Sequence, residues 1–171
     1  MGVGHGLLYQ HFAALGWTVS GVEPGDWGAG FPGVVRSIDA IDACSAFDLI
    51  VAMDVLEHVQ DPIGMVSRMH RMAAPGARLF MAFPNRDSLR GRWGKGQWRM
   101  VRPFGHLHFF SKASARRMLQ SAGLTVQTIR TTDLMSWTDV AGPRSTLLYL
   151  GQFVGLGDQL VIEAKTSPTS L

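Results

Sequence analysis

Three closely spaced glycines and a later carboxylate could together bind a nucleoside. Gly2, Gly4 and Gly6 directly precede a segment with helical apolar periodicity. Glycines at the mouth of a helix let backbone N–H groups approach a ligand closely. Glu23 falls at the expected carboxyl end of the next strand, where an acid commonly accepts hydrogen bonds from ribose hydroxyls. A plain glycine loop and a solvent-exposed carboxylate are the alternatives.

The spacing of the glycines restricts the kind of cofactor. A dinucleotide fingerprint, G-x-G-x-x-G, needs a third glycine at position 7, where this chain has Leu7. A nicotinamide-dependent dehydrogenase is therefore disfavoured. The observed G-x-G-x-G fits a cofactor whose own backbone carries no pyrophosphate.

A second group of polar residues follows the apolar run 47–53. Asp54, Glu57 and His58 come where an open α/β sheet binds its ligands, outside the carboxyl ends of the strands. Core packing explains a Glu-His pair poorly at such a place. These three side chains could bind a hard cation, but they form no recognisable metal motif, and we expect no metal.

Three histidines are candidates for a general base, because an unperturbed imidazole titrates near neutral pH. They are His58, His106 and His108. His106 and His108 alternate along the chain, so in an extended segment only one of them would point inward. A packing or capping role is the alternative for each.

The elements that must position these residues alternate between helix and strand. Apolar periodicity, caps and breakers predict helices at 6–15, 61–72, 111–122 and 145–153, and strands at 18–23, 33–37, 47–53, 77–83, 124–129 and 159–164. Leu7, Leu8, Phe12 and Leu15 would form the buried face of the first helix. This order predicts an α/β fold of the Rossmann-like, doubly wound type, with a mostly parallel sheet and helices on both faces.

Composition narrows the class of protein further. The 171 residues, 46% of them hydrophobic, suit one folded domain, which we expect at 1–165 with a polar tail at 166–171. No apolar run approaches the roughly 18 residues of a membrane span. The single cysteine, Cys44, excludes an internal disulfide and favours a reducing cytoplasm. A net charge of +3 does not by itself indicate nucleic acid.

Residues 86–110 are expected to form an insert that covers a substrate, irregular at least from 86 to 102. Its basic and indole side chains could instead track RNA phosphates and stack on bases; they are Arg86, Arg90, Arg92, Trp93, Lys95, Trp98, Arg99 and Arg102. We favour a lid over a small molecule, because the rest of the chain shows no basic face.

The motifs together resemble class I S-adenosylmethionine-dependent methyltransferases, in particular the branch with ubiquinone-biosynthesis O-methyltransferases. The resemblance covers residues 1–130 best and rests on Gly2-Val3-Gly4-His5-Gly6, Val22-Glu23-Pro24, Phe47-Asp48-Leu49-Ile50, Asp54-Val55-Leu56-Glu57-His58-Val59, Pro75-Gly76, Phe83-Pro84-Asn85, His106-Leu107-His108-Phe109-Phe110-Ser111 and Ala122-Gly123-Leu124. It implies S-adenosylmethionine as cofactor and a small-molecule acceptor.

The same resemblance implies roles for individual residues. Gly2, Gly4 and Gly6 would lie along the methionine part of the cofactor and Glu23 would hold the ribose. Asp39, or less favourably Asp42, would contact the adenine. Met53 and Asp54 would line the sulfonium side, with Glu57 and His58 near the transferred methyl.

One departure from the family concerns the start of the chain. In the family a first strand precedes the glycine turn, in the middle of the sheet, whereas here the turn begins at Met1. We therefore expect an unpaired ladder between strands 18–23 and 47–53, and weak cofactor binding without further upstream residues. A fragment of a longer active enzyme is the favoured reading; an inactive remnant or a non-catalytic partner subunit are the alternatives. The sequence indicates neither the oligomeric state nor the acceptor.

Overall fold

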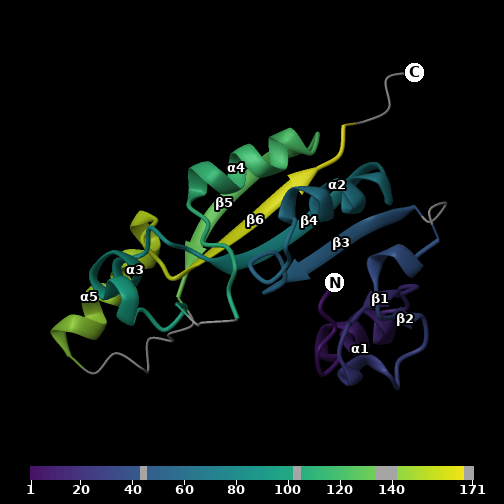
Figure 1. The fold of residues 1–171 in the computed structure, drawn as a ribbon, viewed down its shortest axis with the longest axis horizontal. Coiled ribbons are helices and arrows are strands. Elements are labelled where there is room, and N and C mark those ends of the chain that lie inside the picture. Colours follow the sequence, from purple (N-terminus) through teal and green to yellow (C-terminus); the bar gives the residue numbers. More distant parts are fainter. Residues whose placement is uncertain (43–45, 102–104, 134–141, 168–171) are drawn as a thin grey trace.

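The computed structural model describes residues 1–42, 46–101, 105–133 and 142–167, arranged around two sheets (Figure 1). The smaller sheet pairs β1 (Gly21–Val22) with β2 (Val34–Val35) in parallel. The larger sheet has the order β3-β4-β6-β5, formed by β3 (Phe47–Met53), β4 (Ala73–Pro84), β6 (Gln159–Lys165) and β5 (Thr125–Thr132). Cys44 and Arg102 lie outside the described residues.

The larger sheet is mixed, with one strand reversed. β3 and β4 are parallel, while β6 is antiparallel to both β4 and β5. Consequently β3, β4 and β5 run in one direction, and their carboxyl ends lie at the same edge. The predicted Rossmann-like, mostly parallel α/β fold is confirmed, with β6 as the antiparallel strand.

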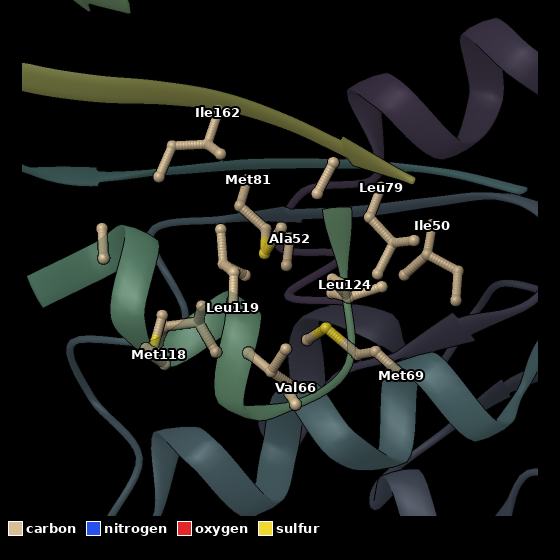
Figure 2. Close-up of a cluster of buried hydrophobic side chains, with 14 of the residues drawn as sticks. Ile50, Ala52, Val66, Met69, Leu79, Met81, Met118, Leu119, Leu124 and Ile162 are labelled. Carbon is tan, nitrogen blue, oxygen red and sulfur yellow. The ribbon is translucent and has the colours of Figure 1, made fainter. Parts of the chain in front are cut away.

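Two helices cover one face of the larger sheet and form the main core with it (Figure 2). These are α2 (Pro62–Arg71) and α4 (Lys112–Ser121). Val66 and Met69 of α2 and Leu119 of α4 are fully buried against Leu79 and Ile162 of the sheet. Removing this much apolar surface from water is the dominant favourable contribution to folding.

The predicted starts of both helices are confirmed by their caps. Asp61 Oδ1 accepts a hydrogen bond from Gly64 N at 2.8 Å, and Pro62 occupies the first turn. The Ser111 and Ser114 side chains form a reciprocal capping box at the start of α4.

The first helix does not bury its apolar face as predicted. In α1 (Leu7–Ala14) no residue is buried, and Leu7 is 81% exposed. Leu15, just beyond the helix, is 62% exposed. Strand 18–23 is also shorter than predicted, since only Gly21 and Val22 pair. In the described structure β1 has a strand partner on one side only, which is β2.

The unpaired edge of β3 and the residues just before β1 face a cavity. Its lining includes Val19 and Ser20 on one side and Leu49 and Val51 on the other. The Met1 ammonium group donates to Val51 O at 2.8 Å, and Gly2 N donates to Val22 O at 2.9 Å. The start of the chain therefore lies between the two sheets and bonds to both, as expected if the ladder there is unpaired.

The segment after β4 is more regular than predicted. It contains α3 (Leu89–Gly94) and the 3-10 turn η3 (Lys95–Gln97), so the expectation of an irregular insert from 86 is wrong there. Local hydrogen bonds organise it, including Arg92 N to Ser88 O at 2.9 Å. The predicted helix at 145–153 is confirmed as α5 (Pro143–Gly151) and η5 (Gln152–Val154).

Two short 3-10 turns complete the description: η1 (Asp26–Gly28) and η2 (Ile38–Ala40), which follow β1 and β2 respectively. Among the residues described, no helix combines the length and apolar character needed to cross a bilayer.

Candidate functional site

The glycine turn adopts a conformation that favours glycine at each of its three positions. Gly2, Gly4 and Gly6 have φ values of 66°, 52° and 78°, in the left-handed region that other residues enter at a cost. A Cβ on Gly6 would clash with the ring of Phe31, and one on Gly2 would meet the side chain of Val55. The Cβ position of Gly4 instead faces open space, with no atom within 4 Å. Gly4 is thus where the turn leaves room for a ligand.

The Glu23 carboxylate joins the end of β1 to this turn. Its Oε2 accepts a hydrogen bond from Gly4 N at 2.8 Å, and its Oε1 accepts one from Gly25 N at 3.0 Å. Each carboxylate oxygen can accept a second hydrogen bond. The Glu23 carboxylate is therefore held beside the open space at Gly4. Its oxygens can still accept hydrogen bonds from hydroxyl groups of a ligand.

Asp39 lies after β2, in the 3-10 turn η2. Its carboxylate pairs with Arg68 of α2 at 3.0 Å, and its backbone N–H is capped by Ser37 Oγ at 3.2 Å. Asp42 follows two residues after η2. An adenine ring approaching Asp39 would meet a carboxylate that already has a cationic partner.

Asp54 terminates β3 in a strained conformation. Its φ of 51° makes it the single non-glycine residue with positive φ among those described, a strain of the kind that clusters at functional sites. Asp54 N donates to Ala82 O at 2.8 Å, while Gln159 Nε2 donates to Asp54 Oδ1 at 3.3 Å. Burial raises the pKa of Asp54, opposed by the nearby His58 and His106. The preceding Met53 is half exposed.

Gln159 is a site residue that the sequence did not reveal. It begins β6, which runs antiparallel to β4, so the start of β6 lies beside the end of β4. A polar residue at the amino end of a strand gives no signal unless that reversed direction is known.

Glu57 is fully buried, and neither of its carboxylate oxygens has a hydrogen-bond partner in the described structure. Burial, followed by the charge of Asp54, raises its pKa to about 7, although its own backbone N–H and His58 oppose the shift. An unpartnered buried carboxyl group is costly. Such a group is a common mark of a functional site.

Two of the three candidate histidines lie against each other beside Glu57. The rings of His58 and His106 are 4.7 Å apart, and Glu57 Oε1 lies 4.0 Å from His58 Nε2. The ring of His108 instead stacks on Phe110 at 6.0 Å. Of the two alternating histidines, His106 has its ring in this group, and which histidine acts as the base stays a prediction.

Backbone carbonyls define the protonation pattern of both rings. His58 Nδ1 lies 2.7 Å from Gly105 O, and His106 Nδ1 lies 2.7 Å from Met100 O. A carbonyl oxygen can only accept, so in each neutral ring Nδ1 carries the hydrogen and Nε2 carries the lone pair. Both rings therefore have Nε2 as their basic nitrogen.

The glycine turn contacts the segment that leads into the acid-histidine cluster. The cluster consists of Glu57, His58 and His106, with one ligand atom from each lying within 4.8 Å of the others. Gly2 lies against Val55 and 3.6 Å from Met53 O, measured from its Cβ position. The cluster could hold a divalent cation or move a proton. Glu57 and His58 follow β3 as Glu23 follows β1, so both groups of candidate residues come after the carboxyl ends of these strands.

A Rossmann-like sheet with a glycine turn and an acid at the next strand end defines a class of nucleoside-binding α/β proteins. Within that class, the family model described as "Methyltransferase domain" matches residues 1–129. The chain belongs to this methyltransferase domain family.

Individual proteins show the same relationship. The ubiquinone biosynthesis O-methyltransferase of Pseudomonas syringae pv. tomato is 31% identical over 101 residues, which are 51% of this chain and 44% of that protein. The Thiobacillus denitrificans enzyme of the same name is 28% identical over 147 residues, 74% of this chain and 63% of that protein. The chain thus spans about half of the length of these relatives.

A solved structure from Thermotoga maritima shares the fold. Described as a SAM-dependent methyltransferase, possibly a histamine N-methyltransferase, it superposes with a TM-score of 0.67 at 20% identity. The match covers 98% of this chain and 80% of that one.

Proposed function

We propose that this chain binds S-adenosylmethionine and transfers its methyl group to a small-molecule acceptor. The observation that carries the proposal is the contact between Gly4 and Glu23, which holds a carboxylate at the edge of an open glycine turn. The names of the two curated relatives and the Thermotoga structure support the same reaction class.

The cofactor fits the residues present. Gly2, Gly4 and Gly6 would lie along its methionine part, and Glu23 would accept from its ribose hydroxyls. Asp39 would face the adenine, with Asp42 as the weaker candidate. Met53 and Asp54 would line the sulfonium side, where a carboxylate favours positive charge. When bound, S-adenosylmethionine supplies an electrophilic methyl group to this site.

The acid-histidine cluster would handle the proton that a hydroxyl or amine acceptor releases. His58 Nε2 is the favoured base, because it carries the lone pair and its side chain is 43% exposed. His106 offers the same nitrogen, and its ring lies 4.7 Å from that of His58. Glu57, when ionised, would stabilise the imidazolium that forms. His108 is the weakest of the three candidates.

Residues 86–110 would form a lid over a small acceptor rather than an RNA-binding surface. Trp98 is only 5% exposed, and Arg90 and Arg99 pair with the buried Asp158. Side chains committed to internal contacts are poorly placed to stack on bases or track phosphates. The cytoplasmic location indicated by the lone Cys44 belongs to the same proposal.

Isothermal calorimetry with S-adenosylmethionine tests the cofactor assignment. Glu23→Gln should weaken binding by about 10-fold or more, since hydrogen bonds to a charged group contribute about 1.5–3 kcal/mol. Glu163→Gln makes the same change on β6, at a surface pair with Arg78, and should leave binding unchanged. Equal affinity in both variants would contradict the assignment.

Methyl transfer from labelled cofactor to phenol and amine probes then separates an enzyme from a non-catalytic partner. Cofactor binding without transfer to any probe would favour the partner. Binding of RNA with a steep salt dependence would favour the RNA alternative.

A further inference from the structure

The Asp158 carboxylate lies just before β6 and is buried. Several side chains of the segment after β4 donate hydrogen bonds to it. It is 0% exposed and accepts hydrogen bonds from Ser88 Oγ and Trp98 Nε1, each at 2.9 Å. Arg90 donates to its other oxygen at 3.2 Å. A buried carboxylate is tolerated only when such donors compensate its lost hydration. Three donors, from positions 88 to 98, are therefore held at one place.

We call Asp158 with its three donors the anchor. Two hydrogen bonds connect this anchor to the acid-histidine cluster. Trp98 O accepts from Val101 N at 2.8 Å, which closes a turn around Met100. Met100 O in turn lies 2.7 Å from His106 Nδ1. The position of the carbonyl that orients His106 thus depends on where Trp98 is held.

A series of ring contacts also connects Trp98 to His106. The Trp98 ring lies 6.1 Å from that of Phe109, which lies 6.4 Å from that of His106. His106 completes the series at 4.7 Å from His58. Displacement of the indole would therefore alter the packing against His106 as well as its hydrogen bond.

We propose that Asp158 is a positioning residue which, through Trp98 and the Met100 carbonyl, holds His106 in the tautomer whose basic nitrogen is Nε2. The effect of Asp158 on catalysis rests on the proposed function; its effect on the His106 ring does not. Without the anchor, Met100 O no longer selects Nδ1–H, and both tautomers of the neutral ring become populated.

The test is nitrogen-15 NMR of the histidine rings in the full chain, at about pH 8 where imidazoles are neutral. His106→Gln identifies the His106 signals by their loss. In the unsubstituted chain they should show a protonated Nδ1 and an unprotonated Nε2. Asp158→Leu, which removes both acceptor oxygens, should move both signals toward the averaged values of mixed tautomers.

A matched variant separates positioning from a general loss of a buried charge. Asp133 is also buried and also binds Arg90, at 2.6 Å, while Ser88 and Trp98 donate to Asp158. Asp133→Leu makes the same change there and should leave the His106 signals unchanged. An equal change in both variants would overturn the proposal.

Trp98→Phe keeps a ring but removes the Nε1 donor, and it serves if Asp158→Leu does not fold. It should shift the His106 signals in the same direction, and unchanged signals in a folded Trp98→Phe chain would also overturn the proposal.

In the variants at Asp158 and Trp98, kcat with an accepted substrate should fall by up to about 100-fold while cofactor affinity stays constant. Failure of the unsubstituted chain to bind S-adenosylmethionine would refute the proposed function alone.

Discussion

The backbone N–H of Gly4 donates to Glu23 Oε2 at 2.8 Å, joining the glycine turn to the end of β1. The contact matters because Gly4 precedes α1 in the sequence and Glu23 follows it. It converts a turn with three left-handed glycines into a surface that presents a carboxylate beside open space. Cofactor binding should therefore depend on both partners.

Gly4→Ala should weaken S-adenosylmethionine binding by about 10-fold or more, because the added methyl group occupies the open space of the turn. The left-handed φ also costs about 1 kcal/mol of stability. Gly76→Ala is the matched control: Gly76 has φ 77° and equally open surroundings, so it carries the same strain elsewhere. Calorimetry and thermal unfolding of both variants make the comparison. Equal affinities would show that no ligand part lies over Gly4.

His58→Gln should lower kcat for a hydroxyl acceptor by about 100-fold or more, the usual contribution of a general base. Affinity for the cofactor should change little, since the contacts proposed for the cofactor come from the glycine turn and Glu23. His108→Gln should have a much smaller effect because its ring stacks on Phe110. Steady-state kinetics with a methyl acceptor decides between them, and a larger loss for His108→Gln would reassign the base.

Glu57 should make the chain less stable as pH rises. Its pKa in the folded state is about 7 against an ordinary value of 4.5, so between these values the folded chain holds a proton that the unfolded chain has released. The free energy of unfolding therefore falls through this range, by roughly 3 kcal/mol in full. Urea unfolding at several pH values measures the fall.

Glu57→Gln should remove most of that fall, leaving a smaller one from Asp54, whose pKa burial also raises. Glu163→Gln, on the surface of β6, should keep the full pH dependence. A Glu57→Gln chain as pH-sensitive as the unsubstituted one would place the titrating group elsewhere.

An added amino-terminal β-strand should tighten cofactor binding. The cavity between β1 and β3, together with the bonds from Met1 to Val51 O and from Gly2 to Val22 O, gives such a strand two edges to pair with. Pairing would immobilise the glycine turn and reduce the ordering cost of binding. A strand of equal length with alternating prolines, which lack the backbone donor, is the control. Identical calorimetric affinities for the two extended chains would contradict the prediction.

Local signals fixed much of the fold in advance. The start of α2 is indicated by Asp61 and Pro62, and the start of α4 by Ser111. These caps act on neighbouring residues and need no distant partner. The apolar run of β3 similarly indicates a strand buried in a sheet. Regularity after β4 was missed because α3 is short and owes its order to buried contacts such as Ser88 with Asp158.

The sequence by itself determined the α/β class, the glycine turn, Glu23 and the segment from Asp54 to His58, because spacing along one chain places these at the ends of consecutive strands. Only the tertiary structure decided which of His106 and His108 joins His58, that Glu57 is buried without a partner, and that Gln159 and Asp158 act at the same edge. The places of Gln159 and Asp158 depend on β6 running antiparallel to β4, and the contact of His106 with His58 depends on two segments that are distant in the sequence. Neither strand direction nor such a contact is set by local sequence.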